Sequence, residues 1–325
     1  MVYKNTENSR DHIAPIHPKF GKFSVEVNFL LLTDNKHCLY SIVTPPSGEK
    51  RDFIRIATIW HVKERGTLMG RLDNKVVLLT GASSGIGKQT AIRFAQEGAK
   101  LTICARRAVQ LEETAKLCEV EGAEVIAYPC DLNNYDDLVK MVALTIERFG
   151  KIDVLVNNAV KGDMPHPLME YTTEDLRQSV ETNFIAPWHL MRLCYPHMKE
   201  NGGGSIVNIC STAGTMGLEG FVCYASTKEA LRGLSRVAAH EWGKDNIRVN
   251  VLNPSAITDS LHAMHLENPE KTQPIFDMMA DIAALKRVGD AYVDVAPAIL
   301  FLASDDSQFM TGQTLNVEGG GFIVP

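Results

Sequence analysis

Several features of membrane, secreted and nucleic-acid-binding proteins are missing from this sequence of 325 residues. Its longest purely apolar runs are only a few residues long, whereas a membrane-spanning helix needs about 20. Its 33 Lys and Arg residues are outnumbered by 39 Asp and Glu, so no basic excess attracts nucleic acid or an anionic membrane. Seven cysteines, an odd number without a Cys-x-x-Cys pair, fit a reducing compartment better than a disulfide framework. No apolar segment follows a basic start, as it would in a secretory signal. We therefore expect a cytoplasmic protein.

From about residue 71 onward, short apolar runs alternate with helical patterns. Runs that are continuously apolar are typical of strands buried on both faces, and their alternation with helices predicts a parallel sheet with right-handed crossovers. The expected strands cover residues 76–79, 101–104, 125–127, 154–156, 206–209 and 249–252. Residues 71–325 are therefore expected to form one α/β domain, a Rossmann-like doubly wound parallel sheet of about seven strands with helices on both faces.

Residues 1–70 lack this rhythm. Partly alternating runs at residues 23–33 and 38–43, followed by a third at 53–62, are compatible with a small β-meander. A loosely ordered N-terminal extension is the alternative, and we find no chemistry in this segment. The expected boundary lies between residues 70 and 71.

A glycine-rich turn follows the first apolar strand directly and opens a helix. A turn of this kind needs glycine where φ is positive and where the backbone must approach a pyrophosphate, which the helix N-terminus then binds. The expected cofactor-binding residues of this turn are Gly81, Ser83, Ser84, Gly85, Ile86 and Gly87.

The turn resembles that of the short-chain dehydrogenase/reductase family, whose motif is Thr-Gly-x3-Gly-x-Gly. The resemblance covers residues 71–325, and among its members the chain is similar to the 3-oxoacyl carrier-protein reductases. It extends to a second motif, in which Tyr224 and Lys228 lie one helical turn apart on one face and Ser211 follows an apolar strand. With Asn183, these residues match the family's Asn-Ser-Tyr-Lys tetrad.

The residue types of the tetrad suit carbonyl reduction. Hydride transfer to a carbonyl leaves an alkoxide that needs a proton, and a tyrosine is too weak an acid to cycle readily at neutral pH without a nearby cation. Tyr224 is therefore expected to be the general acid and base, with Lys228 lowering its pKa. Ser211 is expected to bind the carbonyl oxygen. The resemblance further implies that Lys228 holds the nicotinamide ribose and that Asn183 holds a water that returns protons.

The end of the second expected strand bears on the choice of cofactor. An acidic residue there would bind the ribose hydroxyls of NAD, but Ala105 takes that place and two arginines follow. A guanidinium pairs well with the 2′-phosphate of NADP. We therefore expect NADP(H) to be favoured over NAD(H), with Arg106 as the first candidate for the phosphate and Arg107 as the second.

The resemblance implies six further cofactor-binding residues and two departures from the family pattern. The implied contacts are Asp131 and Leu132 at the adenine, Asn158 and Ala159 after the fourth strand, and Ile257 and Thr258 at the nicotinamide end, the last two forming one expected pair. Val160 and Ser255 stand where the family usually has glycine. Because a β-branched residue disfavours positive φ, we expect the loop at Val160 to be reshaped.

Residues 259–288 correspond to the family's variable substrate lid. They are rich in apolar side chains, which indicates a hydrophobic or acyl substrate. Ordinary helix packing would also explain these side chains. His262 and His265 lie three apart without neighbouring cysteines or clustered acids, so we expect no metal site. Residues 312–320 resemble the strand and loop at the family's tetramer interface, so a homo-oligomer, a tetramer or a dimer, is expected.

Taken as residues and resemblance together, the sequence predicts an NADP(H)-dependent oxidoreductase that interconverts a ketone and a secondary alcohol. The expected partner is a small-molecule carbonyl or alcohol, with no nucleic acid and no membrane. An NAD-dependent alcohol dehydrogenase of the same family is one alternative. The other is a cofactor-binding sensor that does not turn over.

Overall fold

The computed structural model describes residues 69–162, 165–257 and 265–323, and the backbone of two strands at 24–32 and 36–44. The chain divides into two compact units, Met1–Met69 and Gly70–Pro325. In the first, β1 (Ser24–Leu32) pairs antiparallel with β2 (Lys36–Thr44), with Ser24 opposite Thr44. The third expected run, at residues 53–62, lies outside the described residues.

The second unit is built on a parallel sheet of seven strands, as the sequence predicts, in the order β11-β8-β7-β6-β3-β4-β5. The strands are β3 (Val76–Thr80), β4 (Lys100–Ala105), β5 (Val125–Pro129), β6 (Val154–Asn157), β7 (Gly204–Ile209), β8 (Ile247–Pro254) and β11 (Thr314–Val317). The chain order reverses between β3 and β6, and in such sheets this is where ligands bind, outside the carboxyl ends of the strands.

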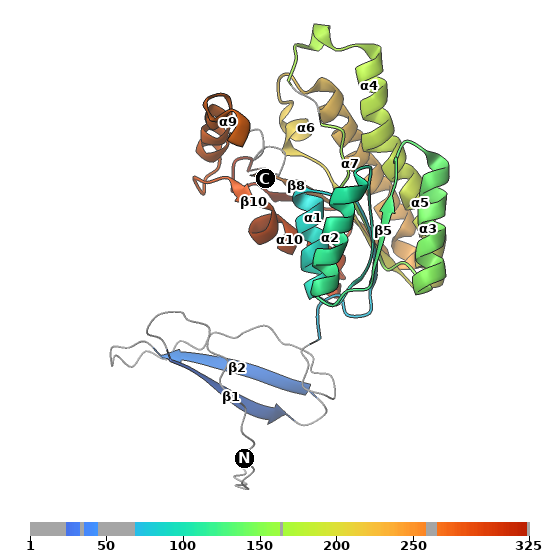
Figure 1. Cartoon of the computed structure of the whole chain (residues 1–325), viewed down its shortest axis with the longest axis vertical. Coiled ribbons are helices and arrows are strands. Elements are labelled where there is room, and N and C mark those ends of the chain that lie inside the picture. The colour runs from blue at the N-terminus through green and yellow to red at the C-terminus, as the bar shows by residue number, and fades with distance from the viewer. Residues whose placement is uncertain (1–23, 33–35, 45–68, 163–164, 258–264, 324–325) are drawn as a thin grey trace. The chain divides into compact units, whose positions relative to one another are not determined.

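Helices cover both faces of this sheet (Figure 1). One face packs against α1 (Gly85–Gln96), α2 (Ala108–Val120) and α10 (Ala296–Ala303). The other packs against α3 (Tyr135–Phe149), α5 (Ala186–Glu200) and α7 (Val222–Trp242). The core side chains on both faces, such as Phe94 on α1 and Leu190 on α5, are fully buried, which explains why the strands read as continuously apolar.

The remaining elements lie mostly around the carboxyl edge of the sheet. They are α4 (Thr173–Val180), α6 (Thr212–Met216), α9 (Pro269–Ile282), and a short parallel pair, β9 (Ala256–Ile257) with β10 (Gly289–Asp290). Short 3₁₀ turns are η1 (Leu168–Glu170), η3 (Gly243–Asp245) and η5 (Asp305–Ser307); π-helical turns are η2 (Glu181–Ile185) and η4 (Ala291–Val295). Within the described ranges, no helix has the length and apolar character needed to span a bilayer.

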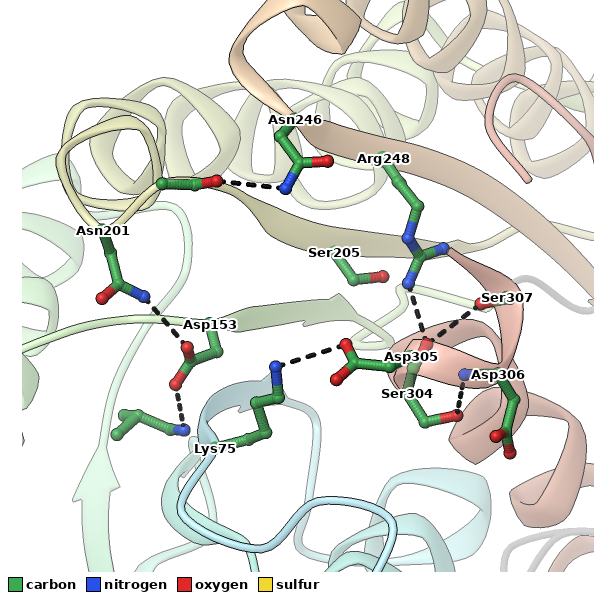
Figure 2. Close-up of polar contacts among 12 residues, drawn as sticks. Lys75, Asp153, Asn201, Ser205, Asn246, Arg248, Ser304, Asp305, Asp306 and Ser307 are labelled. Atoms are coloured by element: carbon green, nitrogen blue, oxygen red, sulfur yellow. Dashed lines mark hydrogen bonds and ion pairs between the residues drawn. The ribbon is translucent and has the colours of Figure 1, made fainter. Parts of the chain in front are cut away.

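The amino edge of the sheet is held by polar contacts (Figure 2). The buried carboxylate of Asp153, just before β6, accepts hydrogen bonds from Val76 N at 2.7 Å and from Asn201 Nδ2 at 3.0 Å. Arg248 in β8 donates to the Leu302 carbonyl at 2.9 Å and to that of Ser304 at 3.1 Å. These bonds join strands to the ends of distant helices, so this edge is a structural one.

Candidate active site

The glycine turn leads from β3 into α1 as the sequence predicts. Gly81 and Gly85 have φ of 72° and 56°, the left-handed region that favours glycine. A Cβ atom on Gly81 would lie 2.7 Å from Ala159 Cα, and one on Gly87 would lie 2.2 Å from the Gly81 carbonyl oxygen. Both positions therefore exclude any side chain, and the turn can offer the N-terminus of α1 to a phosphate group. This geometry fits a dinucleotide.

The loop after β6 is tied to the glycine turn by Thr80. The Thr80 hydroxyl accepts from the backbone N–H groups of Asn158 and Ala159, both at 3.0 Å. Asn158 Nδ2 in turn donates to the carbonyls of Thr80 at 2.9 Å and Gly81 at 3.2 Å. Asn158 and Ala159 are expected to contact the cofactor. In the structure their polar atoms hold the loop after β6 against the glycine turn.

At the adenosine end, Arg107 rather than Arg106 contacts the glycine turn. Arg107 Nη2 lies 3.1 Å from Ser83 Oγ and 2.5 Å from Ser84 Oγ. Arg106 is exposed and lines a cavity that the glycine turn also lines, so an anion in that cavity can reach its guanidinium. Both arginines line one cavity with the glycine turn, but the hydrogen bonds to Ser83 and Ser84 belong to Arg107.

Two of the catalytic candidates, Tyr224 and Lys228, line one cavity together with the glycine turn. Ser211 follows β7 and caps α6, with its Oγ accepting from Ala213 N at 3.1 Å. Tyr224 lies in the first turn of α7, and Lys228 follows one turn later with its Nζ 5.7 Å from the centre of the Tyr224 ring. Lys228 is 2% exposed, and its Nζ donates to the Ile209 carbonyl at 2.8 Å. The structure therefore brings Ser211, Tyr224 and Lys228 together.

The acidities of these groups follow from burial. Burial raises the pKa of the Tyr224 phenol above its usual value, and a hydrogen bond with the Ser211 side chain lowers it by a smaller amount. Burial lowers the pKa of the Lys228 ammonium. Burial is the largest influence on the pKa of Tyr224 in the structure, and the expected lowering of that pKa by Lys228 stays a prediction.

Asn183 joins the site through its side chain. It lies in the π-turn η2, and π-turns inside helices are frequent at functional sites. Asn183 Oδ1 accepts from Lys161 N at 2.8 Å, and Nδ2 donates to the Lys161 carbonyl at 3.1 Å. Nδ2 also lies 3.1 Å from Ser179 Oγ and 3.3 Å from Thr227 Oγ1. Both amide protons are therefore engaged within the protein, and the proton-returning water that the resemblance implies at Asn183 stays a prediction.

These residues surround a cavity of about 810 Å³. The expected cofactor residues that line it are Gly81, Ser83, Ser84, Gly85, Ile86, Gly87, Arg106, Asp131, Leu132, Asn158, Ala159, Tyr224 and Lys228. Ser211 and Asn183 adjoin the lining residues: Ser211 is hydrogen-bonded to Tyr224, and Asn183 to Lys161. Ile257 lies on β9, next to the lining residue Ala256, and Thr258 and His262 lie outside the described residues.

Sequence reasoning missed some lining residues. Lys161, Gln178, Thr182, Cys130 and Cys210 also line the cavity. Cys130 and Cys210 directly precede expected site residues in the sequence, a signal that could have identified them. Gln178 and Thr182 belong to α4 and η2, and no motif marks them.

The two departures from the glycine pattern do not strain the backbone. Among the described residues, the non-glycine positions with positive φ are Asn74, Asn246 and Lys286, so neither Val160 nor Ser255 needs the conformation that glycine allows. Val160 lines the cavity with 47% of its surface exposed. Ser255 N donates to the Val317 carbonyl at 2.8 Å.

Comparisons with known proteins agree with this geometry. The family model described as short chain dehydrogenase matches residues 75–270. A 12alpha-hydroxysteroid dehydrogenase of Clostridium sp. is 38% identical over 78% of this chain and 98% of that protein. The (+)-borneol dehydrogenase 2 of Salvia officinalis is 36% identical over 80% of this chain and 93% of that protein. A solved 7 alpha-hydroxysteroid dehydrogenase, complexed with NADH and 7-oxo glycochenodeoxycholic acid, superposes with a TM-score of 0.71 at 36% identity, covering 77% of this chain and 95% of that one.

Proposed function

Because this chain belongs to the short-chain dehydrogenase/reductase family and is an oxidoreductase acting on CH–OH donors, we propose that it interconverts a ketone and a secondary alcohol with NADP(H). The observation that carries the proposal is that Tyr224 and the buried Lys228 line the same cavity as the glycine turn, with the Ser211 side chain hydrogen-bonded to Tyr224. It supports a reaction in which Tyr224 gives a proton to a substrate held next to the dinucleotide.

Each side chain has a distinct task in this proposal. A nicotinamide cofactor, when bound, supplies or accepts the hydride. Tyr224 Oη gives its proton to the carbonyl oxygen as that oxygen gains negative charge, and takes the proton back in the reverse direction. The Ser211 hydroxyl donates to the same oxygen and holds it near Tyr224. The Lys228 ammonium favours the phenolate that remains, since a cation next to a developing anion lowers its energy.

The preference for NADP(H) is supported by charge at the adenosine end. Ala105 leaves no carboxylate at the end of β4 to accept from ribose hydroxyls, and Arg106 and Arg107 both line the cavity. Since the related 7 alpha-hydroxysteroid dehydrogenase is complexed with NADH, an NAD-dependent enzyme is the second candidate. Titrating NADPH and NADH against the same preparation separates the two.

For the substrate we propose an apolar, ring-built alcohol or ketone. Relatives named for hydroxysteroids and borneol support this class. Apolar side chains stand exposed on two segments beside the site: Met169 and Leu168 in η1, and Met216 and Leu218 between Ser211 and Tyr224. The two segments are neighbours, because Gly220 O accepts from His166 N at 3.0 Å and from Tyr171 Oη at 2.8 Å. An apolar rim of this kind suits a hydrophobic ring system.

We also propose a cytoplasmic homo-oligomer. The six cysteines among the described residues are free and buried, which is compatible with a reducing compartment. On α7, Ser226, Ala230 and Gly233 form an exposed strip of small residues that would allow close helix approach. Light scattering on the purified full chain tests this: a dimer or tetramer is expected, and a monomer at micromolar concentration would contradict it.

A panel of ketones tests the activity itself. Cyclohexanone, menthone, camphor and a 7-oxo bile acid are each incubated with the enzyme and NADPH, and the absorbance of the reduced nicotinamide is followed. We expect consumption of NADPH with at least one of them. The cofactor-binding sensor would instead be favoured if NADPH bound tightly but no ketone led to its consumption. The same holds if none of the corresponding alcohols reduced NADP⁺.

A further inference from the structure

Val160 stands in the cavity where the family usually has glycine, and its backbone is held on both sides. Before it, Ala159 N donates to the Thr80 hydroxyl at 3.0 Å. After it, Lys161 N and O are bonded to the two ends of the Asn183 amide, at 2.8 and 3.1 Å. Val160 can therefore not move aside without breaking bonds to the glycine turn or to Asn183.

The side chain of Val160 has little rotational freedom of its own. A β-branched residue has few accessible χ1 rotamers, so its two methyl groups keep their positions more firmly than a longer chain would. Val160 is 47% exposed, and it lines the same cavity as Tyr224, Lys228 and Ala159. Its φ is not in the left-handed region, so valine occupies this position without strain. The result is a rigid apolar wall in the cavity.

We infer that Val160 is a specificity-determining residue, a fixed wall that limits the bulk a ketone can carry next to its carbonyl group. The inference rests on the proposed function, because it assigns Val160 to the ketone and not to the dinucleotide. A wall that cannot yield excludes a substituent by steric overlap, and small differences in volume against such a wall change specificity by about 10- to 200-fold.

Two ketones and three variants test this. Cyclohexanone is the unhindered probe, and menthone is the same ring with an isopropyl group beside the carbonyl and a methyl group across the ring. Val160→Ala removes two methyl groups and keeps the backbone restraint, while Val160→Gly removes the whole side chain. Val160→Thr keeps the shape and replaces one methyl group with a hydroxyl, so it is the matched control for volume.

The first measurement is the ratio of kcat/KM for menthone to that for cyclohexanone with NADPH. We expect the ratio to rise by at least about tenfold in Val160→Ala, to stay high in Val160→Gly, and to change by less than about threefold in Val160→Thr. The Kd for NADPH should stay within about threefold in all variants. A ratio that is unchanged in Val160→Ala, or an equal loss for both ketones, would overturn the inference.

The second measurement does not depend on turnover. Each ketone is titrated calorimetrically into the complex of the enzyme with NADP⁺, which cannot reduce it. The same rise in the ratio of menthone to cyclohexanone affinity is expected in Val160→Ala, and an unchanged ratio would overturn the inference. Absence of turnover in the wild-type enzyme, by contrast, would count against the proposed function, while the binding ratio would still decide the role of Val160.

Discussion

The two edges of the parallel sheet carry polar side chains of similar kinds but use them differently. At the amino edge, Asp153 binds Val76 N, Asn201 and Lys151, and Arg248 donates to the carbonyls of Leu302 and Ser304. The Leu302 carbonyl accepts from three side chains, those of Arg248, Ser205 and Ser307. Figure 2 shows Arg248 and Ser307 both bonded to the Ser304 carbonyl. Charge at this edge is matched by protein partners.

At the carboxyl edge, charged and polar groups face a cavity. Lys228 is almost completely buried, yet the bond that the structure shows for its Nζ is to the Ile209 carbonyl, which leaves protons for other acceptors. Tyr224 is bonded to the Ser211 side chain and lines the same cavity. Burying a charge is costly, and a ligand that accepts from the Lys228 ammonium, as we expect of the cofactor's ribose, would offset that cost. The two edges therefore differ in the partners of their polar groups. At the amino edge these partners are protein groups, and at the carboxyl edge polar groups line a cavity.

The largest effect is expected from Lys228→Met, which keeps an unbranched apolar chain and removes the ammonium. Turnover should fall by at least about 10²-fold, because the phenolate of Tyr224 loses its stabilising cation. NADPH binding should weaken as well, because Lys228 is the expected ribose contact. Steady-state kinetics and fluorescence titration measure the two effects. Wild-type turnover in this variant would mean that Lys228 has a structural role only. It would contradict the functional difference between the two edges of the sheet.

Replacing Arg106 and replacing Arg107 should have different effects on the binding of NADPH and NADH. Arg106→Ala should weaken NADPH binding by about 10- to 150-fold, the equivalent of about 1.5–3 kcal/mol for a charge-assisted hydrogen bond, and leave NADH unchanged. Arg107→Ala should weaken both cofactors, because it releases Ser83 and Ser84 of the glycine turn. Binding titrations of both dinucleotides measure this. An equal loss of NADH and NADPH in Arg106→Ala would show that it does not read the 2′-phosphate.

Asp153→Asn tests the structural edge. Loss of the charge at this buried acceptor should lower the free energy of unfolding by about 1.5–3 kcal/mol, with kcat per folded molecule changed less than twofold, roughly. Asp305→Asn is the matched control: its carboxylate is 78% exposed and paired with Lys75, so it should cost less than about 1 kcal/mol. Urea denaturation provides both values. A large loss of kcat in Asp153→Asn would mean that this edge also serves the reaction.

The smallest effect concerns pH. Burial raises the pKa of Tyr224, so the phenol stays protonated through neutral pH and well into the alkaline range. Ketone reduction uses the protonated form and should vary by less than about tenfold between about pH 6 and 9. Alcohol oxidation uses the phenolate and should rise with pH over the same range. Initial rates in both directions measure this, and oxidation that falls as pH rises would contradict the role of Tyr224 as base.

Much of the fold and of the site could be predicted from the sequence, because local patterns specify them. The apolar runs at residues 76–79 and 154–156 became strands β3 and β6, and the spacing of four residues placed Tyr224 and Lys228 on one face of α7. The glycine turn could be recognised for the same reason: its positive φ angles and close contacts are local requirements.

What could not be predicted depends on contacts between distant segments. Arg106 and Arg107 are adjacent in the sequence, and only the chain's turn into α2 decides that Arg107 reaches Ser83 and Ser84. The bonds of Asn183 to Lys161 depend on a π-turn that no motif announces. Val160 has no positive φ, whereas the expectation that its loop is reshaped relative to the family stays a prediction.

The Tyr224→Phe variant tests the central claim most directly, because it removes one hydroxyl group from the functional edge and keeps the ring. With a ketone that the wild-type enzyme reduces, turnover should fall by about 10²–10⁴-fold, the usual scale of general acid catalysis. The Kd for NADPH should stay within a few-fold, and the free energy of unfolding should change by less than about 1 kcal/mol, since no partner of the amino edge is touched. Turnover close to that of the wild-type enzyme would contradict the account.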